Sequence, residues 1–375
     1  MKRLVLFGFV LVFTLLAGYL RFGPIEPVRK VASHLPEEVT RKIRPEIIPA
    51  IANDLAFPPA VELNYPRPKW ENDAAKQGKL VSIATLQAND LGRHKVNGNR
   101  LNYLATGSDF IAVADLASKH VVILAPELKI RRKWPMTAGV ASLMQAPIAL
   151  TARNDEIAAL DQDGTLVWWD SRGKRLGSFA IDGVVSDLAI QRNGDLLVHQ
   201  TKPYPYVLAQ YERNGRKEMQ FGALTSDDVN SAPLLHQGHL ALSNKGEVAL
   251  VLINPYQLYF FNADGRPRLT VRIIPEFQVF EPFAEQLGAK RWRVLRQKVV
   301  HDVQWHQGQL WVLVAPDAER AASWLEIFSS EGELLQRYYL TMNAIQITFW
   351  QDDLVLLGFD PRLKMERFRI ERIQQ

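Results

Sequence analysis

The chain has 375 residues, no cysteine, 47% hydrophobic residues and a formal net charge of +5 at neutral pH. The absence of cysteine excludes disulfide bonds, thiolate metal sites, c-type haem attachment and a lipid-modified cysteine, and it suits an oxidising compartment. The hydrophobic content is sufficient for a large buried core.

The first predicted element is the apolar segment Leu4–Leu20, which is uncharged and follows Lys2 and Arg3. Such a segment is typical of a membrane anchor or a secretory signal peptide. A cleavable signal has small residues just before the cleavage site, whereas the best sites here include a leucine. We therefore expect residues 1–22 to form an uncleaved, single-pass anchor in a bacterial-type inner membrane, with the remaining chain in the periplasm or outside the cell. Secretion after cleavage is the alternative, and both locations argue against a nucleic-acid partner.

Residues 23–78 are predicted to form a linker, because they contain nine of the 21 prolines. A proline-rich chain is extended and semi-rigid, so this segment is typical of a stalk, with one short helix expected at Glu37–Ile43. Its apolar part, IIPAIANDLAF, is equally consistent with packing along the wall of the following domain.

One hairpin pattern recurs through residues 79–375. In DQDGTLVWWDSRGKRLGSF, an apolar strand ends at Trp169, a turn contains Gly173, and an alternating strand contains Phe179. The glycine thus has an aromatic residue four positions before it and another six positions after it. The same offsets recur at Tyr211, Gly215 and Phe221; at Phe261, Gly265 and Val271; at Phe328, Gly332 and Tyr338; and, in degenerate form, at Leu124, Leu128 and Trp134.

A polar residue and a short apolar run precede each hairpin, as in DFIAVAD from Asp109 and EVALVLI from Glu247. Another strand precedes several of these runs, so each unit has about four short strands. Units of roughly 40 to 65 residues that bury their faces only against their neighbours predict a β-propeller. We expect an all-β fold with six four-stranded blades, or seven if residues 79–105 form a further blade.

The repeats resemble known propeller families. DGTLVWWDSRGKRL resembles a blade of the PQQ-like propellers, and the rhythm of the units resembles the six-bladed NHL and TolB-like propellers. The resemblance covers roughly residues 79–373 and concerns the fold alone, because no active-site motif accompanies it. A quinoprotein would repeat tryptophan at one position of every blade, but different aromatic residues occupy that position here, so the sequence argues against PQQ and haem.

The C-terminal unit, residues 343–371, has three recognisable strands where the others have four. The segment Lys79–Ala88 belongs to no other unit, and its apolar residues Val81, Ile83 and Leu86 fit a half-buried strand. We therefore predict that residues 79–88 pair with the C-terminal sheet and leave no open edge there.

The innermost strands of a propeller begin at the mouth of its central channel, so residues at these positions converge. Such oxygen-rich positions suit a calcium-type site, and the resemblance to lactonase-like six-bladed enzymes implies a metal there, although the glutamate that those enzymes place early in the ring is missing. Capping of turns is the alternative role. The predicted binding residues are Asn102, Asp187, Asn230 with Ser231, His301, Asp302 and Asn343.

An insertion occupies about residues 275–300 and has a partial helical face at Phe283, Leu287 and Val294. We predict a solvated helix that caps one face of the propeller. Its cationic stretch would dock an acidic partner or anionic headgroups. The predicted docking residues are Lys290, Arg291, Trp292, Arg293, Arg296 and Lys298.

The chain lacks the G-x-S-x-G, H-E-x-x-H, P-loop and G-x-G-x-x-G signatures, and we predict no catalytic residue. The favoured function is a membrane-tethered, extracytoplasmic binding or scaffold module for an envelope protein or a polysaccharide. The alternative is a metal-dependent hydrolase of the lactonase type, or a lyase, that uses the polar residues at the channel mouth.

Overall fold

The structure is a computed structural model, and it describes residues 59–64, 79–87, 90, 101–136, 144, 147–181, 183–200, 206–223, 235–288, 291–316, 322–360 and 362–371. These residues belong to one compact unit, Asp54–Gln375. The predicted anchor and the predicted helix at Glu37–Ile43 lie outside the described residues. No helix within the described ranges combines the length and the apolar composition needed to span a bilayer.

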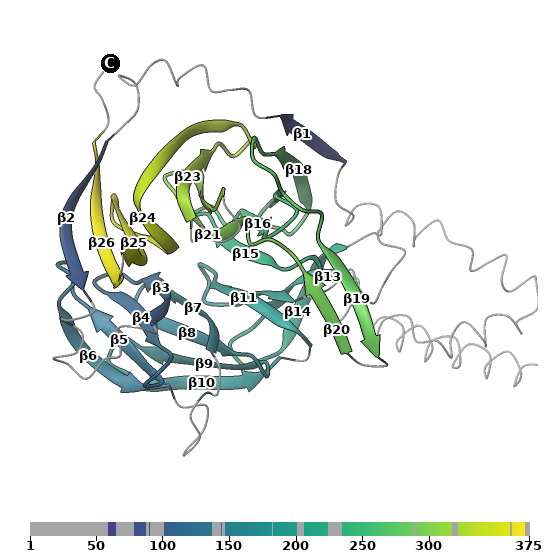
Figure 1. The fold of residues 1–375 in the computed structure, drawn as a ribbon. Helices are drawn as coiled ribbons and strands as arrows, with labels where there is room; N and C mark the ends of the chain where they lie inside the picture. Colours follow the sequence, from purple (N-terminus) through teal and green to yellow (C-terminus); the bar gives the residue numbers. More distant parts are fainter. Residues whose placement is uncertain are drawn as a thin grey trace, which may run out of the picture. The chain divides into compact units, whose positions relative to one another are not determined.

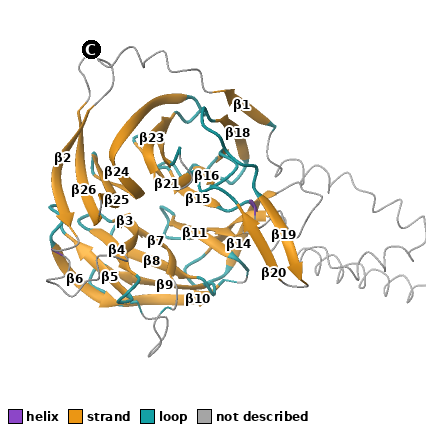
Figure 2. Ribbon diagram, viewed as in Figure 1, coloured by secondary structure: helices purple, strands orange, loops and turns teal. Residues whose placement is uncertain are grey.

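The described elements are strands, arranged as small sheets around an axis (Figures 1 and 2). Three sheets each consist of four antiparallel strands that are consecutive in the chain. The first contains β3 (Leu101–Thr106), β4 (Ile111–Asp115), β5 (His120–Leu124) and β6 (Ile130–Pro135). The second contains β7 (Pro147–Arg153), β8 (Glu156–Asp161), β9 (Thr165–Asp170) and β10 (Arg175–Ala180). The third contains β11 (Val185–Ile190), β12 (Leu196–Gln200), β13 (Tyr206–Tyr211) and β14 (Lys217–Ala223).

The fourth sheet has the same antiparallel core and one additional strand. Its core consists of β15 (Gly238–Leu242), β16 (Val248–Leu252), β17 (Gln257–Phe261) and β18 (Pro267–Ile274). The additional strand, β1 (Ala60–Asn64), pairs in parallel with β18, with Ala60 opposite Thr270. Five residues of the predicted linker therefore extend the outer edge of this sheet.

The last sheet has seven strands, in the order β2-β26-β25-β24-β23-β22-β21. Their bounds are β21 (Val300–His306), β22 (Gln309–Val314), β23 (Ala322–Phe328), β24 (Leu334–Trp350), β25 (Asp353–Asp360), β26 (Arg362–Glu371) and β2 (Lys79–Gln87). The long strand β24 pairs with β23 mainly through its first part and with β25 through its second part, from Asn343 to Trp350. It thereby joins two groups of four strands, one formed with β21–β23 and the other with β25, β26 and β2.

The predicted pairing of the N-terminal strand with the C-terminal sheet is confirmed. β2 lies antiparallel to β26, with Lys79 opposite Glu371 and Gln87 opposite Lys364. A register irregularity at Ile83 interrupts the predicted alternation, so that Ile83 is exposed whereas Leu86 is buried. Leu86 belongs to a hydrophobic cluster that combines residues of the first and last sheets.

The glycine of the hairpin pattern adopts the conformation that the pattern predicts. Gly173, Gly215, Gly265 and Gly332 have φ angles of 88°, 87°, 81° and 79°. Each donates its N–H to the carbonyl three residues earlier, at 2.9–3.1 Å. In the degenerate copy, Leu128 has a φ of 60° and donates the same bond at 2.9 Å. The five hairpins therefore share one turn, in which glycine avoids the steric cost of a positive φ.

The same glycines are also contacts between neighbouring sheets. A β-carbon at Gly215 would lie 2.8 Å from Cγ of Phe179, which is the residue six positions after the turn glycine of the preceding sheet. The equivalent pairs are Gly173 with Trp134, Gly265 with Phe221, and Gly332 with Val271. The residue six positions after each turn glycine therefore packs against the turn glycine of the following sheet. Hydrophobic clusters between successive sheets complete this packing.

The predicted helix in the insertion is wrong, because the segment forms a two-stranded hairpin. β19 (Phe283–Gly288) pairs with β20 (Arg291–Leu295), and Phe283 lies opposite Leu295. Phe283 and Leu287 are four residues apart, a spacing that places two side chains on one face of a helix and also on one face of a strand. A short apolar pattern of this kind does not distinguish the two structures.

Candidate functional site

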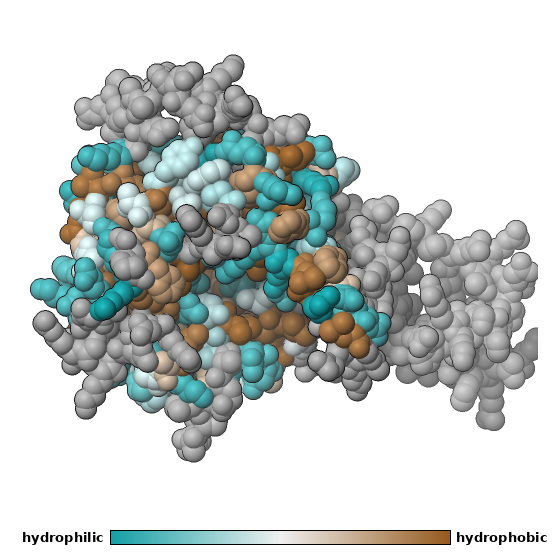
Figure 3. Space-filling model, viewed as in Figure 1, coloured by the Kyte–Doolittle hydropathy of each residue, from teal (hydrophilic) through white to brown (hydrophobic). Residues whose placement is uncertain are grey.

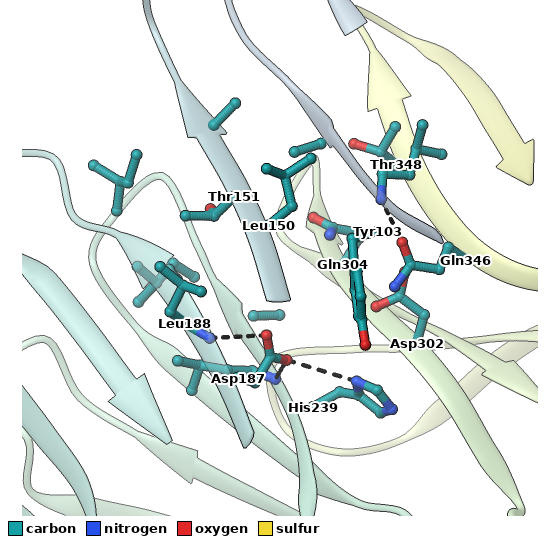
Figure 4. A pocket seen from close by; sticks show the side chains of 18 of the residues that line it. Tyr103, Leu150, Thr151, Asp187, Leu188, His239, Asp302, Gln304, Gln346 and Thr348 are labelled. Atoms are coloured by element: carbon teal, nitrogen blue, oxygen red, sulfur yellow. Dashed lines mark hydrogen bonds and ion pairs between the residues drawn. The ribbon is translucent and has the colours of Figure 1, made fainter. Parts of the chain in front are cut away.

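A cavity of about 140 Å³ lies among the innermost strands β3, β7, β11, β15, β21 and β24 (Figures 1 and 4). It is the counterpart of the predicted channel mouth. Several of its polar side chains are placed to contact a ligand or the neighbouring backbone. They are Tyr103, Thr106, Arg153, Asp187, His239, Asp302, Gln304, Gln346 and Thr348.

Asp187 on β11 connects its own sheet to the next one. Its Oδ2 accepts the backbone N–H of Leu240 on β15 at 2.9 Å, and its Oδ1 accepts the N–H of Leu188 at 2.8 Å. Oδ2 also lies 3.6 Å from Nδ1 of His239 (Figure 4). The Nε2 atom of His239 has no hydrogen-bond partner within the described part of the chain. His239 therefore presents an unpartnered ring nitrogen beside the Asp187 carboxylate.

Asp302 on β21 makes the equivalent connection further along the chain. Its Oδ2 accepts the N–H of Ile347 on β24 at 2.9 Å, and its Oδ1 accepts the N–H of Val303 at 2.9 Å. Burial raises the pKa of Asp302 to about 7, because desolvation disfavours the carboxylate more strongly than His239 and the two N–H groups favour it. Asp302 can therefore exchange a proton near neutral pH.

A third connection joins the last sheet to the first. The side-chain Oε1 of Gln346 on β24 accepts the N–H of Leu104 on β3. The hydroxyl groups of Thr106 and Thr348 lie 3.0 Å apart at the same junction. Polar side chains of the innermost strands thus hydrogen-bond the backbone of the next innermost strand, which holds neighbouring sheets in register.

Register irregularities explain why these side chains reach the neighbouring strand. β3, β7, β11, β21 and β24 each have an irregularity against the following strand. In β11, β21 and β24 the residue directly after the extra position is Asp187, Asp302 or Gln346. An extra residue bends the strand and redirects the following side chain.

Tyr103 occupies the extra position of β3 and has a φ of 56°. A bulky residue rarely adopts this conformation, which costs about 1 to 3 kcal/mol and is concentrated at functional sites. Burial, and next the negative charge of Asp187, raise the pKa of Tyr103 to about 12, so its hydroxyl stays protonated. Figure 4 shows Tyr103, His239 and Asp302 directed toward the same part of the cavity.

The structure brings together only some of the residues predicted for this site. Asp187 and Asp302 line the cavity, whereas Asn102, His301 and Asn343 do not. Asn343 is exposed, and His301 is buried with a pKa lowered to about 3 by desolvation and next by the charge of Lys298. Asn230 and Ser231 lie outside the described residues.

Tyr103, His239 and Gln346 were not predicted from the sequence. Tyr103 and Gln346 lie one and three residues after the predicted starts Asn102 and Asn343, because register irregularities displace the inward-facing position. His239 lies on β15, which has a regular register and begins at Gly238, well after the predicted start at Asn230 and Ser231. Nothing in a single sequence marks an extra residue of this kind. A polar residue inside an otherwise apolar first strand is the one signal that could have identified His239 and Gln346.

The predicted calcium-type site needs several carboxylate, imidazole or carbonyl ligands at one point. Within the ranges that the structure describes, no group of three or more His, Asp or Glu side chains is placed to hold a metal ion. Asp187 and His239 form a pair, and both oxygens of Asp302 accept backbone N–H groups. The described cavity therefore offers one carboxyl group with a raised pKa, Asp302, rather than a complete ligand set.

The predicted docking residues occupy the β19–β20 hairpin and the segment after it. Arg293 pairs with Glu285 at 2.6 Å, directly across the two strands. Arg296 hydrogen-bonds Gln237, and burial lowers its pKa, so it lies against the propeller. Lys298 is exposed. Arg291 and Trp292 belong to β20, but their side chains lie outside the described part of the chain, as does Lys290.

Exposed hydrophobic side chains, rather than a continuous cationic face, distinguish this hairpin. Phe283, Leu287 and Leu295 are 51%, 52% and 43% exposed, and Phe280 just before β19 is 62% exposed. Figure 3 shows hydrophobic and hydrophilic side chains alternating over the region of β19 and β20. Several exposed large apolar side chains on one short hairpin are consistent with an interaction surface.

No protein-family model matches the chain, and no curated protein matches it in sequence. Solved structures do match its fold. Virginiamycin B lyase from Staphylococcus aureus has a TM-score of 0.50 with 9% sequence identity, over 78% of this chain and 100% of that chain. The WD40 β-propeller domain of Doa1 has a TM-score of 0.47 with 12% identity, over 72% and 79% of the two chains. BamB from Moraxella catarrhalis has a TM-score of 0.45 with 9% identity, over 78% and 100%.

Identities this low carry information on the fold alone. The order of the sheets, the repeated hairpin and the similarity to the lyase agree on one architecture. The described chain is a β-propeller.

Proposed function

We propose that the protein is a non-catalytic binding and scaffold module, anchored in a membrane by Leu4–Leu20, that binds another protein of the cell envelope on the extracytoplasmic side. The single observation that carries this proposal is the β19–β20 hairpin. It forms a separate two-stranded sheet, and it exposes Phe283, Leu287 and Leu295. A fold that needed the hairpin only for stability would bury these side chains.

The proposal treats the rest of the described chain as a rigid support with six blades. Six hydrophobic clusters among the described residues support this count, since each combines residues of two neighbouring groups of four strands. The acids at the channel mouth support it as well. The carboxylates of Asp187 and Asp302 each accept a backbone N–H of a neighbouring innermost strand, which is a structural role.

The test compares two triple variants of the full chain in detergent extracts of its own membranes. The first carries Phe283→Ser, Leu287→Ser and Leu295→Ser on the hairpin. The matched control carries Leu176→Ser, Val184→Ser and Leu335→Ser, which replace apolar residues of similar exposure (42%, 42% and 44%) elsewhere on the propeller.

We expect the control to retain an envelope protein that co-purifies with the unaltered chain, and the hairpin variant to lose it without a lower melting temperature. Equal retention by both variants would contradict the proposal. Retention of a polysaccharide instead of a protein would leave the scaffold role and change the partner.

One observation favours a second candidate function, a hydrolase or lyase at the channel mouth. Asp302, His239 and the strained Tyr103 converge in the cavity, and the raised pKa of Asp302 lets this carboxyl group exchange a proton near neutral pH. Metal analysis of the purified chain separates the two functions. Stoichiometric calcium or a transition metal that Asp187→Asn releases would favour the enzyme.

A further inference from the structure

We propose that the β19–β20 hairpin takes its partner by strand addition: an extended, acidic segment of another protein pairs with one free edge of the hairpin as a third strand. This inference rests on the proposed function and specifies how the partner is recognised.

The backbone of the hairpin supports strand addition. β19 and β20 pair only with each other within the described part of the chain, so each strand has one edge whose N–H and C=O groups make no ladder bonds. Propellers normally leave only short, protected edges. An edge strand that carries apolar side chains is the template that extended peptides use when they add to a sheet.

The side chains on one face of the hairpin also support strand addition. Phe283 lies opposite Leu295, and Glu285 lies opposite Arg293, with which it forms an ion pair of 2.6 Å. Leu287, at the register irregularity between Gln286 and Gly288, is a further exposed apolar side chain of the hairpin. An apolar surface with an ion pair at its centre fits the side chains of another strand, which alternate between apolar and polar contacts.

The same two features argue against insertion of the hairpin into a lipid bilayer. Free N–H and C=O groups at the edges would have no partner among lipid chains, and each would cost several kcal/mol. The Glu285–Arg293 pair would also have to leave water. A protein strand satisfies the edge and leaves the ion pair at the surface.

The positive net charge of residues 281–298 favours an acidic partner. Residues 281–298 contain five cations, Lys290, Arg291, Arg293, Arg296 and Lys298, against two acids. Both acids already pair with arginines, Glu285 with Arg293 and Glu281 with Arg272 at 3.1 Å. The excess positive charge therefore favours a partner strand rich in Asp and Glu.

The test is site-specific crosslinking with the full chain in its native membranes. A benzophenone-bearing residue is placed at Leu287 on β19 or at Leu295 on β20, and at Leu176 on β10 as a control of similar exposure. Each crosslinked peptide is then identified by mass spectrometry. We expect the hairpin probes, but not the control, to label one segment of another protein that has no helix-forming pattern and more Asp and Glu than Lys and Arg.

A double variant, Glu285→Arg with Arg293→Glu, tests the charge argument. It preserves the ion pair across the hairpin but lowers the net charge of β20 from +2 to 0, so the yield of the crosslink should fall about tenfold if an acidic strand binds to the edge of β20. A double variant with an unchanged yield would overturn the acidic partner.

Strand addition would be overturned by crosslinks to lipid, to residues 1–58 of the same chain, to a second copy of the chain or to a helical segment, and by no labelling above the control. The proposed function fails separately, because it requires only that the serine variants of the hairpin lose their partner. If the serine variants lose a partner whose crosslinked segment is helical, the scaffold role is supported and strand addition is rejected.

Discussion

Substitution of Gly215 tests whether the turn glycines join neighbouring sheets. Gly215→Ala makes two changes at once. It places an L-residue at a φ of 87°, and it adds a β-carbon 2.8 Å from Cγ of Phe179. Gly308→Ala is the matched control, because Gly308 has a φ of 75° but no heavy atom within 4 Å of the added β-carbon.

The two variants should differ by the contact alone. A positive φ costs an alanine about 1 to 2 kcal/mol, which is the whole effect expected for Gly308→Ala. At Gly215 the ring of Phe179 must also move, and overpacking of this kind adds about 1 to 3 kcal/mol. We therefore expect Gly215→Ala to lower the free energy of unfolding by about 2 to 4 kcal/mol.

Urea unfolding followed by tryptophan fluorescence measures both losses. A double-mutant cycle with Phe179→Ala isolates the contact, because in that background Gly215→Ala should cost no more than Gly308→Ala. Equal losses for the two glycine variants in the unaltered chain, or a cycle with no coupling, would refute the packing explanation of the six-residue offset.

Three further predictions concern stability. Asp302→Asn tests the buried carboxyl group. The pKa of Asp302 is about 7 in the folded chain and has an ordinary value near 4 in the unfolded chain. Asp302 therefore stabilises the fold fully below pH 4 and loses that contribution as the pH rises to 7. The free energy of unfolding of the variant, minus that of the unaltered chain, should therefore rise by about 1.4 kcal/mol per pH unit between pH 4 and 7, and parallel pH profiles would contradict the assignment. Glu326→Ala removes one of the two carboxylates that pair with the fully buried Arg337, whereas Glu276 remains at 2.6 Å; the loss should therefore stay below the about 3 to 5 kcal/mol expected for an unpaired buried charge, and the double variant with Arg337→Met should recover part of it in the same urea titration. Deletion of residues 1–78 removes β1, which adds a fifth strand to a sheet of four, and should still leave a cooperatively melting chain; deletion of residues 1–88 also removes β2, leaves the group of β24–β26 with three strands and should produce aggregates in size-exclusion chromatography.

The propeller could be predicted because its repeat lies in local residue types. The turn glycine, the apolar residue four positions before it and the one six positions after it each have a local structural requirement: a positive φ, a buried strand end and a contact with the next sheet. The pairing of β2 with β26 followed from counting strands in each unit. These features depend on short stretches whose neighbours in space are fixed by the repeat itself.

The cavity and the hairpin were harder to predict for a different physical reason. A single extra residue in β3, β11 or β24 decides which side chains face the channel, and many residue types tolerate such an irregularity. The hairpin segment has the spacing of a helical face, and only the pairing of Phe283 with Leu295 shows that its structure is a sheet. The strand at Ala60–Asn64 was not predicted, because it lies in a proline-rich segment and adds a fifth strand to a sheet whose four repeat strands were already assigned.

The most direct test measures the affinity of the full chain for the envelope protein that we propose as its partner. The dissociation constant is determined for the unaltered chain, for the hairpin variant with serine at Phe283, Leu287 and Leu295, and for the control with serine at Leu176, Val184 and Leu335. We expect the hairpin variant to bind at least about tenfold more weakly, since a single hot-spot residue among the three contributes about 2 kcal/mol or more, and the control to bind like the unaltered chain. Equal affinities of all three proteins would contradict the assignment of the hairpin as the docking element.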